Sequence, residues 1–133
     1  MDLEALIEYG KECARESELK FKHCTLITRG TGDSRKIVAK GCNRYIMDLL
    51  NHNHSIHSEV AALEDFIDNH VNIRLPRQKR IQIAKNIMRK GSYDMIVVRI
   101  GLNNHDKVCY SMPCKKCQKH LGEWTLRDIY YTT

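Results

Sequence analysis

One imidazole and two thiols, far apart in the chain, constrain this sequence more than any other feature. His57 begins the tripeptide His-Ser-Glu, and Cys114 and Cys117 follow Pro113 in a Cys-x-x-Cys motif. Cysteines three residues apart on one helical turn direct both sulfurs to a common point, and with one histidine they supply three of the four ligands of a tetrahedral zinc ion. A fold that uses all three ligands must bring two distant segments together.

Such a donor set is typical of catalytic zinc sites, because the fourth position stays free for a water molecule whose pKa falls to about 7. Glu59 lies two residues after His57 and is not needed as a ligand. We therefore expect Glu59 to take the proton from the water and pass it to a substrate. A helix that starts at His57 favours this chemistry, since its dipole stabilises negative charge at the N-terminus. The expected cofactor is one Zn²⁺ per chain.

A closed structural zinc site is the main alternative. Its ligands would be three cysteines and one histidine from one segment: Cys109, Cys114, Cys117 and His120. In that arrangement His57 and Glu59 would take no part. His52 and His54 are further candidate ligands, although a loop rich in Asn and His is usually solvated. Cys-x-x-Cys alone would also suit a redox pair or half of a zinc ribbon.

The length of 133 residues predicts a single domain, 1–133. Six cysteines without a recognisable export signal favour a reducing, cytoplasmic compartment, where thiols and metal ligation are commoner than disulfides. The longest purely aliphatic run covers only residues 95–98, so no membrane span is expected.

Hydrophobic periodicity predicts an α/β fold. Apolar residues at helical spacing predict helices over 3–17, from about 57 onward, over 76–90 and over 114–121. Short apolar or β-branched runs predict strands over 24–28, 37–39, 93–100, 108–110 and 126–131, the first two joined as a hairpin by a glycine-rich turn. The alternation of helices and strands indicates a layered sandwich.

Positive charge is concentrated in one segment. The net charge is +6, and residues 69–93 contain no acidic residue but seven lysines and arginines: Arg74, Arg77, Lys79, Arg80, Lys85, Arg89 and Lys90. An apolar stripe of Ala84, Ile87 and Met88 favours a helix packed on the domain with a solvated cationic side. The other interpretation is phosphate capture from a nucleotide or a nucleic acid. No exposed aromatic residue is interleaved with the cluster, which favours small nucleotides over polynucleotides.

These motifs resemble the cytidine and deoxycytidylate deaminase superfamily, whose zinc enzymes carry His-x-Glu and Pro-Cys-x-x-Cys. The similar segments are residues 41–43, 55–63, 111–117 and 128–132, and they span nearly the whole chain. In particular, the chain resembles the short deaminase-like proteins of large DNA viruses. The resemblance implies a three-layer α/β/α sandwich with a mixed central sheet, in which both motif helices lie on one face and hold the zinc between them.

The resemblance also implies roles for individual residues. His57, Cys114 and Cys117 match the zinc ligands, and Glu59 matches the proton shuttle. Among the substrate-binding positions, Asn43 matches an asparagine that hydrogen-bonds the sugar or base, and the backbone around Ser58 and Ser111 lines the base pocket.

Two departures from the family pattern bear on the substrate. The two motifs are separated by a basic helical insertion at about 69–91, and the chain stops at Thr133, directly after the strand that follows the zinc helix. Relatives continue with a strand and a helix that help to close the pocket. Part of the active-site wall is therefore expected either to come from a neighbouring subunit or to be absent, and the first of these predicts a homo-oligomer.

The leading functional hypothesis is a zinc-dependent hydrolase of nucleotide metabolism that converts the cytosine of cytidine, deoxycytidine or dCMP to uracil and releases ammonia. Its partner would be a small nucleoside or nucleotide. One alternative is an editing deaminase acting on cytosine or adenine in RNA or DNA, which should bind oligonucleotides through Arg77, Lys79 and Arg80. The other is a catalytically silent, zinc-stabilised binding or structural protein.

Overall fold

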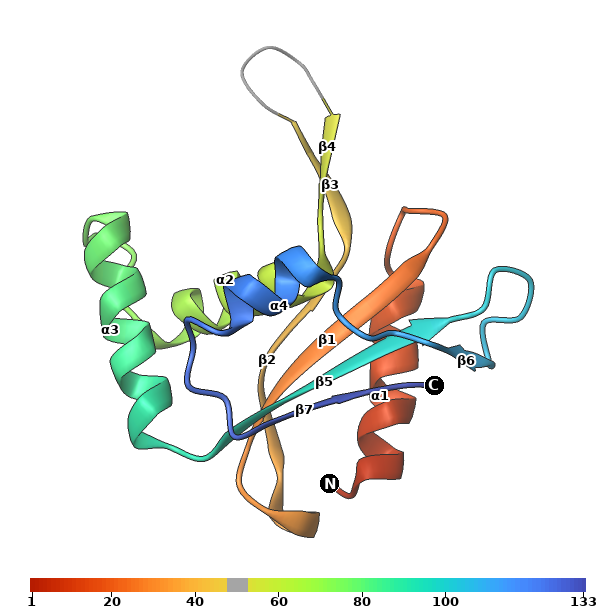
Figure 1. Ribbon diagram of the computed structural model, residues 1–133, viewed down its shortest axis with the longest axis horizontal. Helices are drawn as coiled ribbons and strands as arrows, with labels where there is room; N and C mark the ends of the chain where they lie inside the picture. The colour runs from red at the N-terminus through yellow and green to blue at the C-terminus, as the bar shows by residue number, and fades with distance from the viewer. Residues whose placement is uncertain (48–52) are drawn as a thin grey trace.

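A mixed five-stranded sheet forms the centre of the protein (Figure 1); the computed structural model describes residues 1–47 and 53–133. The strands are β1 (Lys22–Arg29), β2 (Lys36–Cys42), β5 (Tyr93–Ile100), β6 (Val108–Cys109) and β7 (Asp128–Tyr131). Their order is β2-β1-β5, and β6 and β7 both pair with β5. β1 runs antiparallel to β2 and β5, whereas β7 runs parallel to β5, so the sheet is mixed as expected.

Helices cover both faces of this sheet. They are α1 (Leu3–Arg15), α2 (Ser58–His70), α3 (Arg77–Lys90) and α4 (Lys115–Leu121). Buried residues of α1 pack against one face, and buried residues of α2, of α3 and from the end of α4 pack against the other. The predicted three-layer α/β/α sandwich is confirmed, and α2 and α4 lie near one another on the same side of the sheet (Figure 1).

The two cores follow from alternation along the central strands. In β5, Ile96 and Val98 contact the α1 layer, whereas Met95 and Val97 contact the layer of α2. Successive side chains of a strand point to opposite faces, so a strand buried on both faces must be apolar throughout. The near-continuous run of apolar residues in β5 satisfies this requirement, which explains why its bounds were predicted correctly.

Gly41 permits a close approach between the backbones of a helix and a strand. A Cβ atom at this position would lie 2.5 Å from the backbone nitrogen of Ala62 and 2.7 Å from the Cβ of Ala61. Ala62 is fully buried against the sheet. The backbones of β2 and α2 therefore pack at a separation that only glycine allows, and this contact holds the helix that begins after His57.

A second, two-stranded sheet lies outside the predicted elements. β3 (Arg44–Met47) and β4 (Asn53–Ile56) pair antiparallel and project away from the central sheet (Figure 1). Arg44, Tyr45, Ile46 and Ser55 in these strands are exposed. The two strands contain no long apolar run, and the sequence pattern therefore gave no strand signal. Strand β4 leads directly into His57 and α2.

Ion pairs hold the basic helix α3 against α2. The guanidinium of Arg80 is largely buried and lies 2.6 Å from Asp68, and Arg77 pairs with Glu64. Lys85 lies over the ring of Trp124 at 5.6 Å. Ala84 and Met88 are fully buried, so the predicted helix and its apolar stripe are confirmed. Two of the three cations expected to bind oligonucleotides are instead paired within the fold.

The remaining predicted elements are present with small differences in length. The first helix ends at Arg15 rather than residue 17, β6 is shorter by one residue, and β7 begins two residues later than predicted. None of the helices that the structure describes has the length and apolar character of a membrane span.

Replacing Gly41 by alanine should destabilise the protein by about 2–3 kcal/mol, because the new methyl group meets backbone atoms that cannot move independently. Urea unfolding followed by circular dichroism measures the change. Gly122→Ala is the matched control: Gly122 has a helical φ of −62°, and an added Cβ would find its nearest atom at 3.4 Å. We expect that change to stay within about 1 kcal/mol. Equal effects at both positions would contradict the role given to Gly41.

Candidate active site

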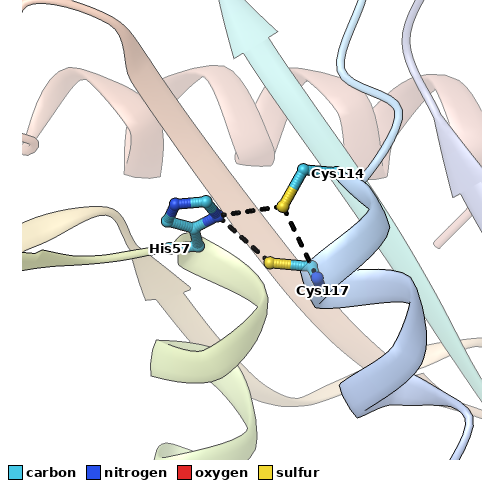
Figure 2. Close-up of side chains that lie close together, drawn as sticks. All are labelled: His57, Cys114 and Cys117. Atoms are coloured by element: carbon cyan, nitrogen blue, oxygen red, sulfur yellow. Dashed lines mark hydrogen bonds between the residues drawn. The ribbon is translucent and has the colours of Figure 1, made fainter.

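His57, Cys114 and Cys117 converge as Figure 2 shows. The Nδ1 atom of His57 lies 3.1 Å from the Sγ of Cys117 and 3.7 Å from the Sγ of Cys114. Zn–S bonds of about 2.3 Å and Zn–N bonds of about 2.0–2.1 Å place tetrahedral nitrogen and sulfur ligands about 3.6 Å apart. The two measured separations lie on either side of that value, so the three donors fit one zinc-sized ion.

The N-termini of two helices bring these three side chains together. His57 is the N-cap residue of α2, and Cys114 is the N-cap residue of α4. The Sγ of Cys114 accepts a hydrogen bond from the backbone N–H of Cys117 at 3.4 Å, and Gln118 donates to the carbonyl of Pro113 at 2.7 Å. These bonds fix the turn that carries both sulfurs, as the Cys-x-x-Cys spacing predicted.

The closed Cys3His arrangement is not formed by the described residues. Among them, the one group of histidine, cysteine or acidic side chains with converging ligand atoms is His57, Cys114 and Cys117. Cys109 lies in β6 and His120 on the exposed side of α4, and neither joins the group. His52 and the side chain of His54 lie outside the described residues.

The electrostatics of the site suit a cation. Burial, followed by the charge of Glu59 and a hydrogen bond to it, raises the pKa of the Cys117 thiol. A thiolate next to a carboxylate is unfavourable in such a place unless a positive charge lies between or beside them. Imidazole and thiolate donors select zinc over magnesium or calcium. The residues present therefore fit zinc, and Glu59, 5% exposed, remains beside the three donors without belonging to their group.

A cavity of about 400 Å³ opens beside the three donors, a volume within the range of small-molecule sites. Its polar lining comes from both motifs and from the start of β1. The lining residues on which the argument depends are Lys20, Phe21, His23, Asn43, Tyr45, His57, Ser58, Glu59, Ser111 and Cys114. All three residues that the resemblance assigned to substrate binding are among them.

The side-chain amide of Asn43 forms hydrogen bonds within the protein. Its Oδ1 accepts a hydrogen bond from the backbone N–H of His23 at 2.9 Å, and its Nδ2 donates to the carbonyl of Phe21. The same Nδ2 lies 3.4 Å from the Nδ1 of His23. Asn43 therefore clamps the segment that enters β1. Its direct contact with a substrate stays a prediction.

The side chain of Ser111 is likewise held by hydrogen bonds to the backbone of neighbouring segments. Its hydroxyl donates to the carbonyl of Val97 at 2.8 Å and accepts from the backbone N–H of Thr132 at 2.8 Å. The hydroxyl of Thr132 donates to the carbonyl of Cys109 at 2.6 Å. This network ties the segment before Pro113 to β5 and to the residue after β7, and so fixes the approach to the cysteines.

Five cavity residues were not found from the sequence: Leu19, Lys20, Phe21, His23 and Tyr45. Burial, followed by the charge of Arg99, lowers the pKa of His23, so its imidazole is neutral at pH 7. Phe21 and Tyr45 are about half exposed, at 47% and 50%. No motif marks these positions. They line the cavity because the segment that leads into β1, the start of β1 and strand β3 all border it, which is a property of the fold.

The fold is the α/β fold of cytidine deaminases, with a mixed sheet and helices on both sides. A crystal structure of a mutant cytidine deaminase from Mycobacterium tuberculosis superposes on it with a TM-score of 0.54. The two chains are 13% identical, and the match covers 100% of this chain and 86% of the other. No family model matches the sequence, and neither does any curated protein. The resemblance to viral proteins stays a prediction.

Metal analysis of the purified protein should give about one zinc per chain, and Cys114→Ser or Cys117→Ser should lower the stoichiometry to well under half. Each loss leaves a site with too few ligands to compete with a chelator. Cys109→Ser and His120→Ala are the controls and should keep the full stoichiometry. Loss of zinc in the controls together with retention in His57→Ala would instead support the closed site.

Proposed function

We propose that the protein is a zinc-dependent hydrolytic deaminase that converts the cytosine of a nucleoside or nucleotide to uracil and releases ammonia. One observation carries the proposal: a buried carboxylate, Glu59, lies beside three zinc-type donors at the wall of a small-molecule cavity. A structural zinc site needs a fourth protein ligand and no acid beside it. The cytidine deaminase fold supports the same conclusion.

The zinc ion and the side chains of the protein would contribute different parts of the reaction. Zinc, held by His57, Cys114 and Cys117, would supply Lewis-acid activation of a water molecule. Glu59 accepts the first proton of that water and delivers it to the ring nitrogen next to the amine-bearing carbon. It then takes the remaining proton from the hydroxyl group now on that carbon and passes it to the departing amine. The substrate thus gains one water and loses one ammonia. The buried position of Glu59 keeps this proton away from bulk solvent.

We further propose that residues 1–133 form one domain in which 69–91 is a helical insertion. The ion pairs of Arg77 and Arg80 with α2 support a packing role for this insertion. Homo-oligomer formation and a cytoplasmic location remain proposals that rest on the sequence.

Glu59→Gln should lower kcat by about 10²–10⁴-fold while one zinc per chain is retained, because the amide cannot accept and return the proton. Ammonia release is measured over cytidine, deoxycytidine and their monophosphates, with guanine and adenine compounds in the same panel. Glu64→Gln is the matched control, since Glu64 lies in the same helix but pairs with Arg77. Full turnover by Glu59→Gln would overturn the mechanism.

The rim of the cavity favours editing of single-stranded nucleic acid as a second candidate function. Phe21 and Tyr45 present half-exposed rings there, and Lys20 lies next to them. Aromatic rings beside cations are the elements on which proteins stack unpaired bases. The sequence pattern gave no aromatic residue near the basic segment, whereas the structure brings two to the cavity.

If the substrate is an oligonucleotide, Phe21→Ala and Tyr45→Ala should each lower kcat/KM on it by about 5- to 150-fold, the equivalent of one lost stacking contact. Turnover of a free nucleoside should be much less affected. Tyr9→Ala, a partly exposed tyrosine on α1 at the other face of the sheet, is the control. Unchanged oligonucleotide turnover, or preference for free nucleosides throughout, would contradict this second candidate.

A further inference from the structure

A chain of buried hydroxyl groups leads from the central sheet to Glu59. The Oγ1 of Thr25, in β1, lies 2.8 Å from the Oγ of Ser58. The Oγ of Ser58, the first residue of α2, donates to the Oε1 of Glu59, also at 2.8 Å. Thr25 is fully buried, Ser58 is 1% exposed and Glu59 is 5% exposed. Each of the three side chains is thus almost fully buried.

The direction of the chain follows from the chemistry of its ends. An ionised carboxylate only accepts hydrogen bonds, so the proton of the Ser58 hydroxyl lies toward Glu59. Because that proton is used, Ser58 must accept from Thr25, and Thr25 is the donor at 2.8 Å. The order is Thr25 to Ser58 to Glu59. A charge-assisted bond at its end, between side chains that are almost fully buried, is stronger than an ordinary hydroxyl pair.

We propose that Thr25 and Ser58 are positioning residues that anchor the Oε1 of Glu59 and leave its second oxygen to face the reacting groups. The inference rests on the proposed deaminase function and names no new contact with the substrate. A free glutamate side chain samples several rotamers, whereas a proton shuttle must stay within a fraction of an ångström of its path. The two hydroxyls hold the carboxylate before a substrate arrives.

The place of the two hydroxyls also favours this role over simple packing. Ala62, Phe66 and Ile67, on the same helix, meet the sheet with apolar surface. A valine at 25 and an alanine at 58 would fill the position without burying polar atoms, whose desolvation is costly. The two hydroxyl side chains are instead present at these positions, and the hydrogen bond that Ser58 donates ends on Glu59.

The test measures steady-state kinetics, zinc content and thermal stability of matched variants. Ser58→Ala and Thr25→Val should lower kcat by about 10- to 100-fold, with KM changed less than about twofold and zinc retained. Thr25→Ser keeps the hydroxyl and should restore most of kcat. Thr28→Val is the matched control: Thr28 is fully buried in the same strand, and its hydroxyl has no hydrogen-bond partner among the described residues. Its kcat should equal that of the wild type.

The double variant Thr25→Val with Ser58→Ala separates a loss of kcat from a loss of folding stability. Removing both hydroxyls leaves no unsatisfied partner between them, so it should melt close to the wild type and still show the kcat loss of Ser58→Ala. Wild-type turnover by the Ser58→Ala and double variants would overturn the positioning role while the deaminase function stands.

Crystal structures of the zinc-loaded wild type and Ser58→Ala separate this inference from the proposed function. If the wild type turns over no member of the substrate panel, the proposed function fails, and the position of the Glu59 carboxylate decides the rest. A carboxylate that rotates away in Ser58→Ala supports the anchoring role. One that keeps its wild-type position overturns it.

Discussion

The packing of α2 against the edge of the sheet is the contact on which the site depends. Gly41 brings the backbone of β2 against Ala61 and Ala62, and the rest of the helix is held by its buried apolar face. The first turn of the same helix carries His57, Ser58 and Glu59. A shift of α2 by the width of one methyl group would move the imidazole away from the two sulfurs, whose separations from Nδ1 leave little tolerance for a zinc ion.

Electrostatic interactions link the cysteine motif at the start of α4 to Glu59 at the start of α2. A thiolate at Cys117 and the carboxylate of Glu59 would both favour a neighbouring positive charge, because burial and the charge of Glu59 raise the pKa of the thiol when no such charge is present. A bound zinc ion would join α2 to α4, a short helix otherwise held by Leu121 and the nearby Trp124 in the core. Binding energy at the three ligands would thus contribute to the stability of this layer.

The features that depend on local pattern were predictable, and those that depend on long-range contacts were not. β5 was predicted from its own β-branched composition, and the turn that carries both sulfurs from the spacing of Cys114 and Cys117, because both signals lie within a few residues. Strands β3 and β4 have no such pattern, and Arg44, Tyr45, Ile46 and Ser55 in them are exposed. His23 and Tyr45 reach the cavity only because separate strands meet there. The sequence likewise could not show that Asn43 bonds to the backbone of residues 21 and 23.

The side chains of the cavity divide into a fixed wall and a free rim. Asn43, Ser58 and Ser111 satisfy their polar atoms within the protein, so their orientations are set before any ligand binds. Such groups shape a site at little entropic cost on binding, and they hold neighbouring backbone and catalytic atoms in place. Adaptable recognition is left to half-exposed residues such as Phe21 and Tyr45. In the proposed deaminase, the buried wall would determine the chemistry, whereas the choice of substrate would depend on the rim.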